Sequence, residues 1–131
     1  MNPEMNPEMN PEVNSEVNSE VNQDMNDILL VFTNLPDASS AEKLAHQLVA
    51  ARAAACVNQL APCTSIYRWK GNIETATEVP LLIKTTRTAY PRLEKLIREA
   101  HPYELPEIIA VPVTAGLPAY LGWVNEATGI I

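Results

Sequence analysis

The segment HPYELPEI, residues 101–108, holds the side chains of this sequence that are best suited to chemistry. His101 supplies an imidazole and Glu104 a carboxylate. Such a pair can bind a divalent metal ion or act as a general acid and base. The segment also contains Pro102 and Pro106, which can simply end a helix and stiffen the entry to a strand. Three interpretations therefore compete: a metal site, an acid/base pair, or a structural helix stop.

The position of Pro102 limits the metal and acid/base interpretations. Glu104 follows His101 by three positions, which would place both on one face of a helix. Pro102, however, biases the residue before it away from helical backbone. The two side chains can therefore meet only through the loop or through a neighbouring subunit. Because the helix ends there, we expect the His101 ring to stay partly exposed.

No motif for enzymatic catalysis accompanies this pair. The sequence contains no glycine-rich phosphate loop, no Cys-His-Asp order and no zinc-protease helix. An acid/base mechanism also lacks a visible nucleophile. We therefore predict that the protein is not an enzyme and keep catalysis by His101 and Glu104 as an alternative.

Cys56 and Cys63 are the two cysteines of the chain. Their spacing of seven residues matches no zinc-binding pattern. Two cysteines without a secretion signal indicate free thiols in a reducing compartment. We therefore expect a cytoplasmic protein in which both cysteines are small buried hydrophobic residues with no part in metal binding.

The first 27 residues differ in composition from the rest. Residues 1–27 repeat a four-residue unit such as MNPE or VNSE and carry seven acidic residues but no Lys or Arg. This acidic, low-complexity composition predicts a disordered tail. Residues 28–131 then form one domain.

The charge of the chain argues against two classes of partner. The whole chain has 9 basic and 16 acidic residues, so removal of the seven tail acids leaves a body with no net charge. We therefore expect no binding to nucleic acid or to an anionic membrane surface. No apolar run reaches the roughly 18 residues that a membrane span needs.

The order of predicted elements indicates an α+β fold. A continuous apolar run over 28–35 predicts a buried strand. It precedes an amphipathic helix in which Ser39 and Glu42 have capping-box spacing. Two strand-like stretches then flank Gly71, which suits a tight hairpin turn.

Prolines and a cap residue set further boundaries. Pro62 and Pro80 must lie at a strand edge, a strand start or a bulge. A second helix, with Thr88 as its expected cap, ends near His101. A strand over EIIAVPV and a short helix over LPAYLGWVNEAT follow. This order predicts a ferredoxin-like split βαβ sandwich with a long central β-hairpin.

Six motifs in this order give the sequence a family resemblance. They are VFTNLPD, AACVNQLAP, TSIYRWKGNIE, EVPLLIKTT, HPYELPEIIAVPV and YLGWV, between residues 31 and 124. Together they resemble the CutA family of divalent-cation tolerance proteins. The resemblance covers nearly all of the predicted domain and leaves out the acidic tail.

The resemblance implies a tight homotrimer of ferredoxin-like protomers, similar to the PII signalling proteins. In such trimers the long hairpin strands pair between subunits. Tyr67 and Trp69 on the hairpin are then the expected trimer interface, which would cover an edge otherwise prone to aggregation.

The resemblance also implies a non-enzymatic protein that binds copper or another divalent cation. The copper site suggested for the family uses a Cys in the first strand and a His-His pair before Pro-Tyr. Here Phe32 or Thr33 occupies the first position and Ala100 precedes His101. His101 is therefore the expected metal ligand, with Glu104 as a weaker candidate.

A PII-like trimer offers a second kind of site. Lys84, Tyr103 and Glu104 are candidates to line a cleft between subunits that binds a small anionic effector. A cation such as Lys84 near a strand end is also commonly just solvated. Cation binding, effector binding and catalysis thus remain as three hypotheses.

Overall fold

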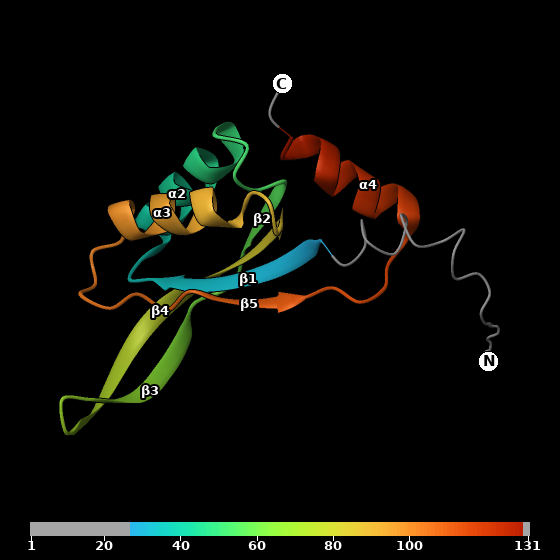
Figure 1. The fold of residues 1–131 in the computed structure, drawn as a ribbon. Coiled ribbons are helices and arrows are strands. Elements are labelled where there is room, and N and C mark those ends of the chain that lie inside the picture. Colours follow the sequence, from blue (N-terminus) through green and yellow to red (C-terminus); the bar gives the residue numbers. More distant parts are fainter. Residues whose placement is uncertain (1–26, 130–131) are drawn as a thin grey trace, which may run out of the picture.

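A computed structural model describes residues 27–129, so the predicted tail lies outside the described residues except for Asp27. Eight elements follow one another along the chain (Figure 1): β1 (Ile28–Leu35), α2 (Ala38–Ala50), β2 (Cys56–Gln59), β3 (Cys63–Trp69), β4 (Asn72–Thr86), α3 (Tyr90–Ala100), β5 (Ile109–Pro112) and α4 (Pro118–Ala127). No helix within this described part is long and apolar enough to cross a membrane.

The strands form one antiparallel sheet, which confirms the predicted α+β class. Its order is β2-β4-β1-β5, and β3 continues the pairing along β4. Helices α2 and α3 lie side by side over one face, and the hairpin of β3 and β4 extends beyond them (Figure 1). The sheet therefore has a covered part and a long projecting arm.

The core lies between the sheet and the two helices. Alternate residues of β1 face the helices, where Leu29, Val31 and Leu35 are buried. They pack in one cluster with buried residues from α2 and α3, namely Ala41, Leu44, Leu48, Leu93 and Ile97. Each such side chain contributes about 1.5–3 kcal/mol on burial, so this cluster fixes both helices on the sheet.

Helix α4 packs separately, beside the start of β1 (Figure 1). Ile28 points away from Leu29 and forms a second buried cluster with Leu121 and Val124 of α4. The Arg52 guanidinium donates to the Ala127 carbonyl at 3.3 Å, near the helix C-terminus, where a cation is favourable. Both contacts hold the last helix against the start of the sheet.

Both predicted helix caps are wrong. Asp37 caps α2, because its Oδ1 accepts a hydrogen bond from the Ser40 N–H at 2.8 Å. That bond lowers the pKa of Asp37 below its usual value. Helix α3 starts later than expected, and the Ala89 N–H donates to Thr86 Oγ1 at 3.1 Å. In each case a residue nearer to the preceding strand satisfies the free N–H, so Ser39 and Thr88 are not needed.

The hairpin turn confirms the sequence prediction. Lys70 and Gly71 connect β3 to β4, and Trp69 pairs with Asn72 across the turn. Their φ angles are +52° and +85°. Two successive positive φ angles are what a type I′ hairpin turn requires.

A β-bulge accommodates both prolines. Gln59 pairs with Leu81 and Cys63 with Glu78, so the β2–β3 side carries one residue more than β4 does. The Leu60 N–H donates to the Pro80 carbonyl at 2.9 Å. Because N and O of one residue point to the same side in an antiparallel pair, the missing N–H of Pro80 faces the bulge and costs no ladder bond.

The cysteines match the prediction only in part. Cys56 and Cys63 are free thiols, as expected. Cys56 is half-buried, but Cys63 is exposed, so its predicted burial is wrong. Cys63 starts β3, which belongs to the arm that the helices do not cover.

The buried hydroxyl of Thr33 leads to a prediction about stability. Its side chain is 1% exposed, and its Oγ1 is the buried side-chain N or O atom without a hydrogen-bond partner among residues 27–129. An unsatisfied buried polar group costs about 1–3 kcal/mol. Thr33→Val should therefore raise the free energy of unfolding by about 1 kcal/mol in denaturant titrations at fixed protein concentration.

Thr85 provides the matched control. It is equally buried, but its Oγ1 donates to the Ala53 carbonyl at 2.6 Å. Thr85→Val should therefore lower stability, because it leaves that carbonyl without its partner. Equal losses in Thr33→Val and Thr85→Val would contradict the assignment for Thr33.

Candidate functional site

His101 ends α3, as the sequence predicts. It is the C-cap residue, with extended backbone, and its N–H donates to the Ile97 carbonyl at 2.9 Å. Pro102 cannot continue the helix because it lacks an N–H and restricts the residue before it. The expectation of a partly exposed ring is wrong, since His101 is only 8% exposed.

Both ring nitrogens of His101 are engaged in hydrogen bonds. Nδ1 lies 3.2 Å from the Tyr103 backbone nitrogen and accepts a hydrogen bond from its N–H. The ring proton therefore sits on Nε2, which donates to the Asn34 carbonyl at 2.5 Å. The Tyr103 ring lies 4.5 Å from the imidazole, centroid to centroid. We call these contacts the His101 clasp, because they fasten residues 101–103 to the end of β1.

A second hydrogen bond supports the clasp. Asn34 Nδ2 donates to Glu107 Oε1 at 2.9 Å. The peptide oxygen of Asn34 thus holds His101 while its side chain holds Glu107. The segment 101–108 is therefore fastened at both ends to one residue of β1.

Tyr103 joins the same segment to the base of the hairpin. Glu78 lies on β4, is 8% exposed and pairs with Cys63 at the start of β3. Burial of the phenol, followed by its hydrogen bond to Glu78, raises the pKa of Tyr103 to about 12. Tyr103 is therefore neutral at physiological pH and acts as a hydrogen-bond donor.

Glu104 lies apart from this arrangement. Its side chain is 73% exposed, and Oε1 is 3.5 Å from Nζ of Lys70 in the hairpin turn. Across residues 27–129 there is no group of three or more His, Cys, Asp or Glu side chains that could hold a metal ion. Within one chain, His101 and Glu104 therefore do not make a complete metal centre.

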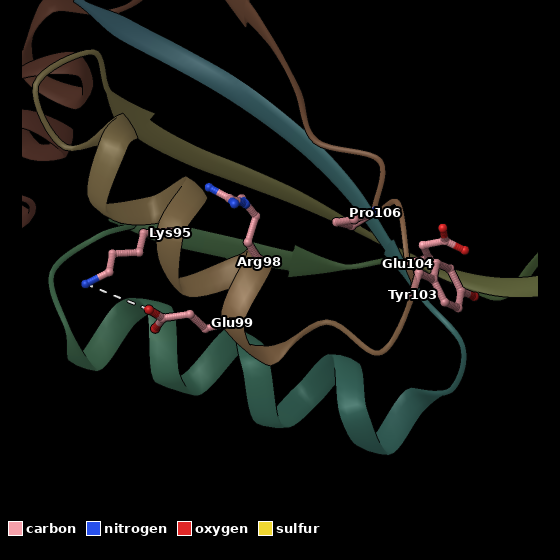
Figure 2. A pocket seen from close by; sticks show the side chains of 6 residues that line it. All are labelled: Lys95, Arg98, Glu99, Tyr103, Glu104 and Pro106. Atoms are coloured by element: carbon pink, nitrogen blue, oxygen red, sulfur yellow. Dashed lines mark ion pairs between the residues drawn. The ribbon is translucent and has the colours of Figure 1, made fainter.

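The three candidates for an effector cleft are not brought together. Lys84 Nζ donates to Asn58 Oδ1 at 2.7 Å, between β4 and β2. Tyr103 and Glu104 instead line an open hollow of about 420 Å³, shown in Figure 2. Its other lining residues are Lys95, Arg98, Glu99 and Pro106. Lys95 and Arg98 are not among the residues predicted from sequence, although their spacing of three places both on one face of the helix before His101.

Exposed apolar side chains are a second notable feature of the described residues. Tyr67 on β3 is 42% exposed, and Trp69 is half-buried. Large apolar side chains are also exposed on the hairpin, on β5 and on α4: Ile66, Ile73, Ile109, Val111, Tyr120 and Trp123. Apolar exposure of this extent is typical of a protein–protein contact surface.

Comparison with known proteins identifies relatives over most of this fold. The family model CutA1 divalent ion tolerance protein matches residues 29–127. The divalent-cation tolerance protein CutA of Thermus thermophilus is 43% identical over 100 residues, which are 76% of this chain and 97% of that protein. Mouse protein CutA is 45% identical over 97 residues, which are 74% of this chain. The chain spans only 55% of the length of that mouse protein.

Solved structures agree with the sequence matches. The crystal structure of CutA from Xylella fastidiosa is 47% identical and superposes with a TM-score of 0.76. It covers 79% of this chain, and the match covers 99% of that structure. The Thermus thermophilus structure, 42% identical, also has a TM-score of 0.76. The motifs, the antiparallel α+β fold and these matches together show that the chain belongs to the CutA1 divalent ion tolerance protein family.

Proposed function

We propose that this protein is a non-enzymatic homotrimer that functions in tolerance of divalent cations. The observation that carries the assembly is the projecting hairpin, whose Ile66 and Ile73 are 71% and 70% exposed in a single chain. Pairing such hairpins between subunits would bury this apolar surface, at about 25 cal/mol per Å². It would also cover the open edge of β3.

The topology supports a ferredoxin-like protomer in this trimer. Four strand positions in the order β2-β4-β1-β5, with α2 and α3 on one face, correspond to a split βαβ arrangement. We propose a PII-like assembly of three such protomers. The N-terminal residues 1–27 would then form a separate acidic tail, dispensable for the body of residues 28–131.

The cellular location is proposed from the thiols. Cys56 and Cys63 are free, which suits a reducing cytoplasm. Relatives differ in this respect, because the Arabidopsis thaliana protein is named chloroplastic and the Archaeoglobus fulgidus protein is named periplasmic. We expect neither nucleic acid nor membrane as a partner, since the body carries no net charge.

For the cation, we propose His101 as the principal ligand and Glu104 as a weaker one. The family's tolerance function and the imidazole support this choice. His101 serves as a ligand only if it gives up one of its two ring hydrogen bonds, to Tyr103 or to Asn34. Modest affinity for copper or another divalent cation is the consequence, and donors from neighbouring subunits are needed to complete a site.

The geometry does not favour an acid/base enzyme. A general base needs a free ring nitrogen within reach of its substrate. His101 is 8% exposed and has both nitrogens hydrogen-bonded, while Glu104 is turned toward Lys70. The non-enzymatic role therefore fits the side-chain arrangement better.

Trp69→Asp tests the trimer. The substitution places an unpaired charge in the proposed interface, at a cost of about 3–5 kcal/mol. Light scattering should show the wild-type chain as a trimer and Trp69→Asp as a smaller species. Tyr67→Asp, at a position more exposed in the single chain, should have the same effect without unfolding the protomer.

Val49→Asp is the control for that experiment. Val49 on α2 is 44% exposed, close to the exposure of Tyr67, but lies outside the hairpin. The Val49→Asp substitution should therefore leave the trimer intact. If both Trp69→Asp and Tyr67→Asp remained trimers, neither residue would belong to the interface.

Copper titration tests the proposed ligand. His101→Ala should abolish most binding in calorimetry, whereas Cys56→Ser and Cys63→Ser should leave it intact. His46→Ala is the matched control, because the side chain of this second histidine is 82% exposed and lies on α2. It should preserve both binding and stability.

His101→Ala should also have a structural effect, because the Asn34 carbonyl loses its donor. We expect the free energy of unfolding to fall by about 1–3 kcal/mol, so binding is measured at a temperature where circular dichroism shows the variant folded. Loss of copper in the thiol variants, with retention in His101→Ala, would move the site to Cys56 and Cys63.

A further inference from the structure

The hollow beside α3 is lined by two cations, Lys95 and Arg98, and by two carboxylates, Glu99 and Glu104. It lies between the last two turns of α3 and the segment that returns from His101, as Figure 2 shows. The Arg98 side chain is exposed and extends outward from α3, and in the view of Figure 2 its guanidinium end points away from Pro106 and Tyr103. Among residues 27–129, no carboxylate forms an ion pair with Arg98.

The two glutamates of the hollow already have partners. Glu99 Oε2 lies 3.8 Å from Lys95 Nζ, one helical turn away. Glu104 Oε1 lies 3.5 Å from Lys70 Nζ. Both pairs are exposed and contribute little to stability, but each offsets a unit of charge. Arg98 is therefore the cation of this lining that forms no ion pair within residues 27–129.

Tyr103 and Pro106 give the hollow an apolar side. Both are half-buried, and both line the space. The Tyr103 hydroxyl is hydrogen-bonded to Glu78 and stays neutral, so it adds no negative charge to repel an anion. The volume of about 420 Å³ lies within the range of about 300–1,000 Å³ typical of small-molecule sites.

These features determine the chemistry of a fitting ligand. A guanidinium donates two parallel hydrogen bonds to a carboxylate or phosphate. An aromatic ring and a proline surface favour a flat apolar group beside that anion. We propose that this hollow binds a small organic anion, with a carboxylate or phosphate on Arg98 and a planar ring against Tyr103 and Pro106.

This site goes beyond the proposed cation function and is independent of it. It needs no metal ligand and no free nitrogen on His101. It also replaces Lys84 with Arg98 as the anion-binding residue, because Lys84 does not line the hollow and is bonded to Asn58. Copper titration and anion titration can therefore fail separately.

The test uses the full chain, labelled with ¹⁵N and titrated with four probes. Benzoate and phenyl phosphate combine a ring with an anion, inorganic phosphate has only the charge, and benzyl alcohol has only the ring. Benzoate or phenyl phosphate should shift amide resonances around residues 98–106 at millimolar concentration. The stronger of the two identifies the preferred anionic group, and each single-feature probe should bind more weakly.

Variants then assign the contact. Arg98→Gln should lower the affinity for the stronger probe at least about tenfold, which is the loss expected for a charge-assisted hydrogen bond. Arg98→Lys should keep an intermediate affinity because it retains the charge but not the planar pair of donors. Lys43→Gln removes an exposed cation from α2 and should leave binding unchanged.

Two results would overturn the proposal. One is equal affinity in wild type and Arg98→Gln, which would mean that Arg98 is not the contact. The other is the absence of shifts around residues 98–106 with both benzoate and phenyl phosphate, which would show a solvated surface rather than a site.

Discussion

The imidazole of His101 is the point on which the arrangement of residues 101–108 depends. Its Nε2 donates to the Asn34 carbonyl at the end of β1, and its Nδ1 accepts from Tyr103. Through Tyr103 and Glu78 the same segment reaches the base of the hairpin. One buried ring therefore sets the position of the end of α3, the start of the return to β5 and one wall of the hollow. A buried imidazole nitrogen without a partner would lower stability, and here both nitrogens have partners.

The family relation and the clasp place different demands on His101. Tolerance of divalent cations calls for an available ligand, whereas the fold uses both ring nitrogens internally. Of the other residues predicted for a site, Glu104 faces Lys70 and Lys84 is bonded to Asn58. A single chain is thus better organised for holding its own loop than for holding a metal. We therefore expect a complete cation site only in the proposed trimer.

The hairpin is the main argument for the proposed assembly. The type I′ turn at Lys70–Gly71 joins its two strands, and the bulge opposite Pro80 increases their twist. Together they produce a long, twisted arm. The arm extends past α2 and α3, so nothing within residues 27–129 covers Ile66 or Ile73. Water contact with these side chains is unfavourable, and burial against other copies is the simplest remedy.

The sequence alone determined the features that rest on local backbone chemistry. The end of α3 at His101 and the turn at Gly71 follow from φ restrictions and missing N–H groups. The missing N–H of Pro80 restricted that residue to a strand edge, a strand start or a bulge. Hydrophobic periodicity likewise gave the element order and the antiparallel α+β class. Tertiary structure alone decided the exposure of Cys63, the burial of His101 and the separation of Lys84 from Tyr103. Each of these depends on which distant group lies opposite a side chain, and spacing along the chain does not encode that distance. Asn34 and His101, far apart in sequence, become hydrogen-bond partners only because β1 lies beside the segment that follows α3.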